Sequence, residues 1–109
     1  MKHLQVTFNA TNNTQNSTQV ALEGSLNNMN AINFKKDLLR IIETEKTDCE
    51  VNIENLDTID ITGLNALAMA HRNLEKQGRT LTVISRAFDQ IDEFLHVTKF
   101  NRFLNIQRA

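Results

Sequence analysis

The hydrophobic period changes within residues 49–74, and no other feature of the sequence constrains the fold as strongly. Cys49, Val51 and Ile53 alternate with polar residues, which is the pattern of a strand with one buried face. Further along, the residues that recur at helical spacing are Leu64, Leu67, Ala68, His71 and Leu74. The sequence therefore predicts a strand that passes through a turn at residues 60–63 into a helix, with these five residues on its inward face.

Thr62 stands at this predicted junction and is followed by Gly63. Its hydroxyl is expected beside the first backbone N–H groups of the helix, which have no partner within the helix itself. Local sequence alone indicates a helix-capping or turn hydroxyl, a role that contributes about 0.5–2 kcal/mol to the fold. Gly78 then supplies a stop signal for the same helix.

The residues before this segment predict two strands and a helix. Apolar and polar residues alternate at positions 4–8, and the polar tract at 9–19 is interpreted as a hairpin loop that leads into a second strand beginning at residue 20, with a turn at residues 24–27. Asn28 or Asn30 is expected to cap the following helix. The apolar stripe of that helix is predicted to contain Phe34, Leu38, Ile41 and Ile42.

The C-terminal part predicts one more strand and one more helix. Residues 81–84 are largely apolar, as in a central parallel strand. Ser85 is expected to cap the last helix, and residues 97–104 are expected to add a short helical turn before an edge segment at residues 105–107. The inward face of the last helix is predicted to contain Phe88, Ile91, Phe94 and Leu95.

This order of elements predicts one α/β domain over residues 1–109. An N-terminal hairpin followed by right-handed crossovers gives a mixed sheet in which the later strands run parallel. Binding sites in such sheets gather at the carboxyl ends of the parallel strands. The loop at residues 57–64 is expected at that edge.

Charge and hydropathy exclude several kinds of partner. The formal net charge of -1 arises from 12 basic and 13 acidic side chains without a block of like charge, so neither nucleic acid nor an anionic membrane surface is an expected partner. The N-terminal residues lack the apolar stretch of a signal peptide, and no apolar run approaches the roughly 18 residues of a membrane span. We therefore expect a cytoplasmic protein without direct membrane insertion.

The sequence holds no motif for catalysis or metal binding. Its glycines, Gly24, Gly63 and Gly78, do not form a phosphate-binding loop. Cys49 is the only cysteine and falls on the apolar side of its predicted strand, which favours a buried thiol. His71 has no second ligand at metal-binding spacing. We therefore expect neither a cofactor nor an enzymatic activity.

The segment Asp60-Ile61-Thr62-Gly63-Leu64 resembles the Asp-Ser-Ser/Thr-Gly-Leu motif of the STAS domain, the fold of bacterial anti-sigma factor antagonists. The likeness continues through residues 20–27, 78–85 and 88–103, which are similar to the second strand, the strand after the motif helix, and the C-terminal helical segment of that family. Two positions differ. Ile61 stands where the family usually has serine, and Asn27 stands where its Gly-x-Leu-Asp turn has an acid.

The resemblance implies a STAS-like fold and a function in regulated protein binding. In that family the hydroxyl residue before the glycine is the phosphoacceptor of a partner kinase, and here that residue is Thr62. The implied partner is an anti-sigma factor with ATP-dependent serine/threonine kinase activity, which would release its sigma factor when bound and would lose affinity after phosphorylating Thr62. A phosphatase is a further candidate partner. Asp60 either caps the helix or orients the nucleotide of the partner. The expected partner surface contains Asn27, Asp57, Asp60, Thr62, Gly63, Asn65, Met69 and Arg72.

Two other functions are compatible with the same fold. A constitutive subunit of a bacterial ABC lipid-transport complex would dock the Thr62 helix permanently onto an ATPase subunit, and persistent co-purification with that ATPase would indicate it. A sensor domain for a small ligand or nucleotide would instead show saturable stabilisation by its ligand.

Overall fold

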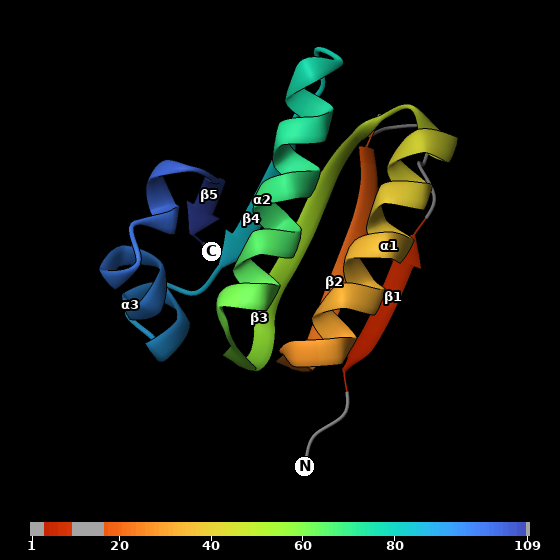
Figure 1. The fold of residues 1–109 in the computed structure, drawn as a ribbon. Coiled ribbons are helices and arrows are strands. Elements are labelled where there is room, and N and C mark those ends of the chain that lie inside the picture. Colours follow the sequence, from red (N-terminus) through yellow and green to blue (C-terminus); the bar gives the residue numbers. More distant parts are fainter. Residues whose placement is uncertain (1–3, 10–16, 109) are drawn as a thin grey trace.

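A mixed five-stranded sheet lies at the centre of the computed structural model, which describes residues 4–9 and 17–108. Its strands are β1 (Gln5–Asn9), β2 (Ser17–Leu26), β3 (Asp48–Ile59), β4 (Leu81–Ser85) and β5 (Asn105–Arg108). They lie side by side in chain order, with β1 antiparallel to β2 and each later pair parallel (Figure 1). The predicted hairpin and parallel crossovers are confirmed.

The predicted loop at residues 9–19 is too long. Ser17 is paired with Asp48 of β3, and Gln19 is paired with both Asn9 of β1 and Glu50 of β3, so the second strand begins before residue 20. Residues 10–16 lie outside the described part of the chain. The polar composition that suggested a loop is compatible with a strand here, because Ser17 and Gln19 are only half-buried.

Three α-helices and a short 3-10 helix connect the strands. Their bounds are Asn28–Glu45 (α1), Ile61–Lys76 (α2), Gln90–Val97 (α3) and Phe100–Arg102 (η1). Right-handed crossovers between successive strands place the helices on one face of the sheet, where α1 and α2 lie side by side and α3 lies beyond α2 (Figure 1). None of the described helices combines the length and the apolar character needed to cross a membrane.

The other face of the sheet is only partly covered. In β2, Leu22 is buried whereas its neighbour Glu23 is exposed, and the same alternation runs along much of β3. The apolar sequence of β4 is typical of a strand buried on both faces, yet Thr82 and Ile84 are half-buried while Val83 is fully buried. The core therefore lies between one face of the sheet and the helices.

The start of α1 corrects the predicted cap. Asn27 is the N-cap, and both Asn28 and Asn30 lie inside the helix. Asn30 closes the turn in another way: its side-chain oxygen accepts a hydrogen bond from the Asn27 N–H at 2.7 Å, and its amide donates to the Ser25 carbonyl at 2.9 Å. The predicted stripe is confirmed for Phe34, Leu38 and Ile42, which are buried together with Ala31, whereas Ile41 is half-buried.

The start of α3 also differs from the sequence prediction. Ser85 is the buried last residue of β4, and Asp89 caps the helix by accepting a hydrogen bond from the Asp92 N–H at 2.8 Å. Phe88 is not part of the inward face, because it precedes the helix with a φ of 64° and is 93% exposed. The core positions of the segment are Ile91 and Leu95, with Phe94 packed against them. The predicted helical turn and edge strand after α3 are confirmed as η1 and β5.

A buried carboxylate joins α3 to the C-terminal strand. Asp92 accepts hydrogen bonds from the Phe88 N–H at 2.9 Å and from the Arg108 guanidinium at 3.0 Å. Burial by itself raises the pKa of the Asp92 carboxyl, but the Phe88 N–H, Arg108 and His96 outweigh burial and hold that pKa below its ordinary value. The carboxylate is therefore charged in the folded protein and fixes β5 against α3.

Cys49 lies in the core of β3, as predicted. Burial and the neighbouring Glu50 raise the pKa of its thiol to about 12, and Arg79 offsets only part of this rise. A thiol with this pKa stays protonated at neutral pH, so Cys49 is a packing residue without thiolate reactivity.

Candidate functional site

The predicted junction between a strand and a helix is confirmed at the end of β3, but the predicted turn at residues 60–63 and loop at residues 57–64 are too long, because only residue 60 lies between the two elements. Residue Ile59 ends the strand, and α2 begins at Ile61. The adjacent strand β2 ends beside it, with Leu26 in register with Ile59, and the Asp60 N–H donates to the Leu26 carbonyl at 3.3 Å. The turns that follow both strands therefore lie next to each other at the carboxyl edge of the sheet.

Asp60 connects the beginnings of α1 and α2. One carboxylate oxygen caps α2 by accepting from the Gly63 N–H at 2.9 Å, and the other accepts from the Asn28 N–H at 3.2 Å. An acid at a helix N-terminus is also favoured by the helix dipole. Of the two roles that the sequence left open for Asp60, the structure assigns helix capping.

Thr62 is the second residue of α2 and is half-buried. Because Asp60 occupies the capping position, the expectation that Thr62 caps the helix is wrong. The Thr62 hydroxyl forms no hydrogen bond with any other residue in the described ranges 4–9 and 17–108. This hydroxyl is thus not needed to complete the turn, and it lies within the first turn of the helix, where backbone N–H groups can stabilise an anion.

Gly63 has a packing role at the same turn. A Cβ atom at this position would lie 2.6 Å from the Leu26 carbonyl oxygen and 2.8 Å from Cγ1 of Ile59. Such distances are too short for any side chain, so only glycine lets the first turn of α2 approach the end of β2. Gly63 is also buried. The predicted partner-surface residue therefore lies beneath that surface.

The inward face of α2 agrees in part with the sequence prediction. Leu64, Leu67 and Leu74 are fully buried, whereas Ala68 and His71 are half-buried at the flank. Two further buried positions, Ala66 and Ala70, were not in the predicted stripe. Their small side chains allow the helix to approach its neighbours closely.

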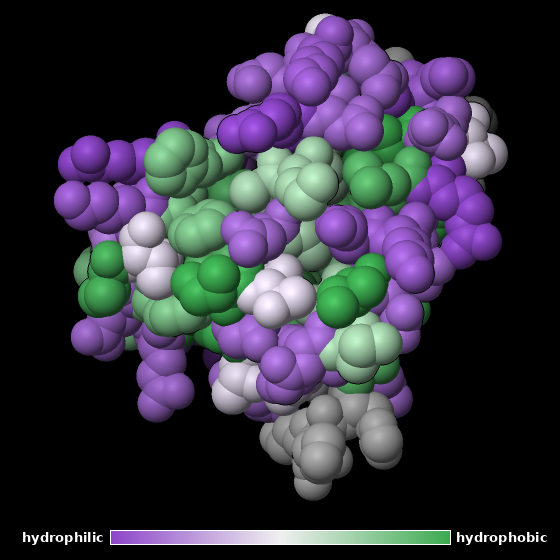
Figure 2. Space-filling model, in the orientation of Figure 1, coloured by the Kyte–Doolittle hydropathy of each residue, from purple (hydrophilic) through white to green (hydrophobic). Residues whose placement is uncertain are grey.

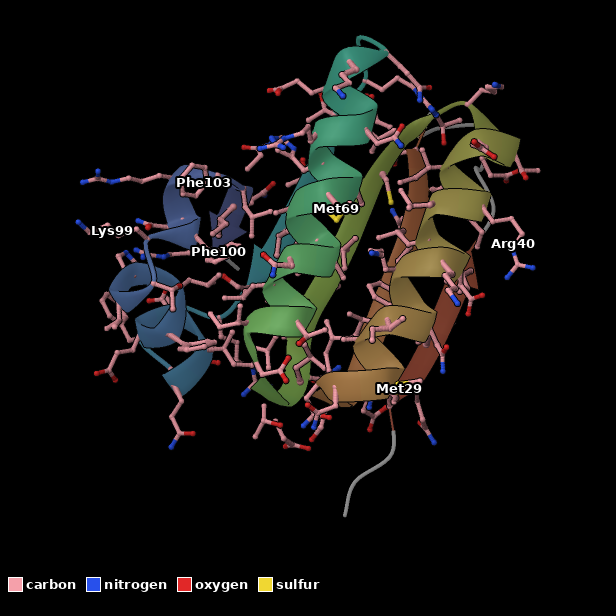
Figure 3. The ribbon with its side chains drawn as sticks, viewed as in Figure 1. Met29, Arg40, Met69, Lys99, Phe100 and Phe103 are labelled. Carbon is pink, nitrogen blue, oxygen red and sulfur yellow. The ribbon has the colours of Figure 1, made fainter. Side chains whose placement is uncertain are left out.

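Exposed apolar side chains lie along the outer sides of α1 and α2, three of them near the helix starts and Met69 two turns further along α2. Met29 is 67% exposed and Ile32 37% exposed on α1, while Ile61 is 47% and Met69 50% exposed on α2. Figure 3 places Met29 and Met69 on the same side of the molecule, on the two neighbouring helices. In Figure 2 apolar and polar side chains are interspersed over this face. We call Met29, Ile32, Ile61, Thr62 and Met69 the Thr62 surface.

Sequence reasoning found only Thr62 and Met69 of this surface. The sequence of α1 did contain a pattern that indicates Met29 and Ile32 as exposed apolar residues. Both fall on the side of the helix opposite the buried stripe at Phe34 and Leu38. Apolar residues on the polar side of an amphipathic helix indicate a contact outside the domain.

The other predicted site residues fall into two groups. Asn27 is half-buried as the cap of α1, beside the Asp60 turn, and Asp57 is exposed near the end of β3. Asn65 and Arg72 are exposed on α2, where Asn65 lies between the turn and Met69 and Arg72 lies beyond Met69. Met69 and Arg72 line one shallow hollow. The structure therefore brings the predicted residues onto one edge of the sheet and one ridge of α2.

Comparison with known proteins establishes the family. The family model described as "Mlab, STAS domain" matches residues 9–106. The chain therefore belongs to the STAS family. No curated protein matches the sequence.

Solved structures agree on the fold. A putative anti-sigma factor antagonist from Thermotoga maritima superposes with a TM-score of 0.78 at 14% identity, covering 94% of this chain and 85% of that one. An anti-sigma factor antagonist from Mycobacterium paratuberculosis gives 0.75 at 14% identity with the same coverage. The Bacillus cell fate determinant SpoIIAA in its phosphorylated form gives 0.67 at 14% identity, covering 94% and 91%. At these identities the likeness demonstrates a shared fold.

Proposed function

We propose that this chain is a regulatory protein-binding module of the anti-sigma factor antagonist type, controlled by phosphorylation of Thr62. The observation that carries the proposal is the position of Thr62. Its hydroxyl has no hydrogen-bond partner among the described residues, and it lies in the first turn of α2 within a surface of exposed apolar side chains. The module acts by binding a partner, and the chemistry is supplied by that partner.

The proposed partner is an anti-sigma factor that is also an ATP-binding serine/threonine kinase, with a phosphatase to reverse the modification. In the unmodified state, Met29, Ile32 and Ile61 would be buried against the partner and would contribute the apolar part of the contact. Similarity in fold to a protein known in a phosphorylated form supports this assignment.

Phosphorylation would weaken this contact through charge and desolvation. A phosphate on Thr62 carries about -1.5 to -2 charges, which would have to be buried among apolar side chains in the complex. The phosphate would also lie near the Asp60 carboxylate, which is a second negative group. Both oxygens of that carboxylate already accept hydrogen bonds, one from the Gly63 N–H and one from the Asn28 N–H. A penalty of about 3 kcal/mol would lower the affinity more than a hundredfold.

The test is phosphate mapping after incubation with the cognate kinase and ATP. We expect one phosphate, located on Thr62 by mass spectrometry, and none on a Thr62→Ala variant. Thr58 is the matched control, because its hydroxyl is nearby in sequence but donates a hydrogen bond to the Ser25 hydroxyl at 2.8 Å. A Thr58→Ala variant should be phosphorylated normally. Phosphate found reproducibly on Thr58 or Ser25, with Thr62 unmodified, would defeat the assignment.

A constitutive subunit of a bacterial ABC lipid-transport complex is the second candidate. The apolar character of the Thr62 surface favours it, because permanent interfaces are more hydrophobic than transient ones. Ile61 and Asn27, which replace a hydroxyl and an acid of the antagonist pattern, favour it as well. The matching family model is described as Mlab and carries no antagonist name. Purification from the native host with an ATPase in a fixed ratio, unchanged by phosphatase treatment, would select this candidate.

A further inference from the structure

A second candidate binding site lies on the flank of α2 that faces the C-terminal segment. It is a groove of about 770 Å³ between α2 and residues 100–105. Ala68, His71 and Arg72 form one wall, and Phe100 and Phe103 form the other. Figure 3 shows both phenylalanines beside α2, on the side of the helix away from α1. We call this cavity the C-terminal groove.

The C-terminal groove is basic. Arg72, Arg79 and Arg102 line it, and its only acidic lining residue is Glu75. Among the described residues, no carboxylate lies within ion-pairing distance of any of these three guanidinium groups. Their positive charge is therefore not neutralised within the described part of the protein.

Arg79 lines one end of the groove, with its guanidinium directed toward the C-terminal end of α1. Its guanidinium donates to the Ile42 and Thr47 carbonyls, each at 3.0 Å, and also to the Gln77 side chain. These contacts fix the position of the charge without neutralising it.

The phenylalanines give the groove an apolar wall. Phe103 is 61% exposed, Phe100 is half-buried, and their rings are 6.2 Å apart at an interplanar angle of 71°. Aromatic residues and arginine are enriched at protein interfaces and among the residues that dominate binding energy. The steep angle between the rings leaves no parallel slot in which a planar base could stack.

His71 adds an unsatisfied polar group. Its Nδ1 atom is buried and has no hydrogen-bond partner among the described residues, while its Nε2 atom lies 3.8 Å from a Glu75 carboxylate oxygen. Buried polar atoms in native proteins almost always have a partner.

We propose that the C-terminal groove binds an acidic segment of a partner protein that carries an apolar anchor side chain. Its carboxylates would pair with Arg72 and Arg102, and its anchor would pack on Phe103. Charge complementarity identifies this occupant. A second copy docked groove to groove would bring arginines together, and a nucleotide would find neither a glycine-rich loop nor a stacking slot. The groove adjoins the predicted partner surface through Asn65 and Arg72 but does not include Thr62, so this proposal does not rest on the proposed phosphorylation.

The test uses a short synthetic peptide that alternates glutamate with leucine and phenylalanine. Its control has every glutamate replaced by glutamine. We expect the glutamate peptide to shift the backbone amide resonances of residues 100–105 and of Ala68 and Arg72, with an affinity that falls as salt is raised. Equal binding of the two peptides, or shifts confined to other parts of the protein, would overturn the proposal.

Variants assign the binding to the groove. Arg102→Glu and Phe103→Ala should each bind the glutamate peptide about tenfold more weakly. Arg86→Glu makes the same charge change at an exposed position outside the groove and should bind as the wild type does. Thr62→Glu should also bind as the wild type does, which separates this test from the proposed phosphorylation switch. If Arg86→Glu or Thr62→Glu lowered the affinity for the glutamate peptide as much as Arg102→Glu does, the proposal would be contradicted.

Two further measurements identify a different occupant if there is one. Displacement of the peptide by ATP, with the same resonances shifted, would make the groove a small-anion site and overturn the proposal. A dimer in analytical ultracentrifugation that Arg102→Glu dissociates would assign the groove to a second copy of the chain and would likewise overturn it. We expect neither displacement by ATP nor such a dimer.

Discussion

Replacing Asp60 with alanine removes the carboxylate that connects α1 and α2. The Gly63 N–H loses its cap, which costs about 0.5–2 kcal/mol. The Asn28 N–H loses an exposed acceptor at 3.2 Å that water can replace, so this second loss is at the lower end of the range of about 0.5–1.5 kcal/mol for a hydrogen bond. Together they predict a loss of about 1–2.5 kcal/mol and a melting temperature lower by about 4–11 °C.

Thermal and urea denaturation followed by circular dichroism would measure this loss. Asp60→Asn is the matched control, because its side-chain oxygen can still accept the Gly63 N–H and asparagine caps helices as well as aspartate does. We expect Asp60→Asn to retain more than half of the lost stability. An Asp60→Ala variant that melts within about 1 °C of the wild type would refute the claim that this carboxylate holds the two helix starts.

Three further predictions concern α2 and the C-terminal segment. Gly63→Ala should lower stability by about 1–3 kcal/mol in urea denaturation, because the added Cβ would meet the Leu26 carbonyl at 2.6 Å; an unchanged midpoint would contradict this packing. A Met69→Ala/Arg72→Ala double variant should melt as the wild type does, since both residues are exposed, but should lose about 1–3 kcal/mol of partner binding in calorimetry; unchanged binding would confine the partner surface to the turns. The pKa of Asp92 is lowered in the folded protein, so the Asp92 carboxylate contributes stability above the ordinary aspartate value of 3.8 and loses that contribution as the pH falls through the lower folded value. Acid should therefore destabilise the wild type more than Asp92→Asn. Parallel profiles of stability against pH for the two proteins would show that this charge is unimportant.

The sheet and the junction at Thr62 could be predicted because burial on one face leaves a direct trace in the sequence. Cys49, Val51 and Ile53 are buried at every second position of β3, and Leu64, Leu67 and Leu74 are buried at helical spacing in α2. Both patterns are local. They locate the turn between the two elements to within a residue or two.

The cap residues of α1 and α3 could not be predicted, because they depend on where the preceding strand ends, and pairing with a strand distant in sequence sets that end. Several asparagines near the start of α1 are plausible caps by residue type, and the choice of Asn27 follows from where β2 ends and from the bond between Asn30 and the Ser25 carbonyl. Ser85 is a good cap by type as well, but its pairing with Arg108 of β5 retains it in β4.

The surroundings of the candidate sites were hidden for the same reason. The bond from Asn28 to Asp60 joins residues 32 positions apart, and it connects the residue that caps α2 to the start of α1. The C-terminal groove likewise exists only because the fold places Phe100 and Phe103 beside His71 and Arg72. Residue types in the sequence indicated interaction surfaces, whereas their grouping required the fold.

The most direct test of the account is the affinity of the purified anti-sigma partner for three forms of this protein: the unmodified wild type, the kinase-treated wild type and Thr62→Glu. Isothermal calorimetry should show binding at least about tenfold weaker for the two modified forms. Their melting temperatures should stay within about 4 °C of the unmodified protein, since an anion in the first turn of a helix is tolerated. Equal affinities for all three forms would contradict a switch at Thr62 and would leave the permanent subunit as the better account.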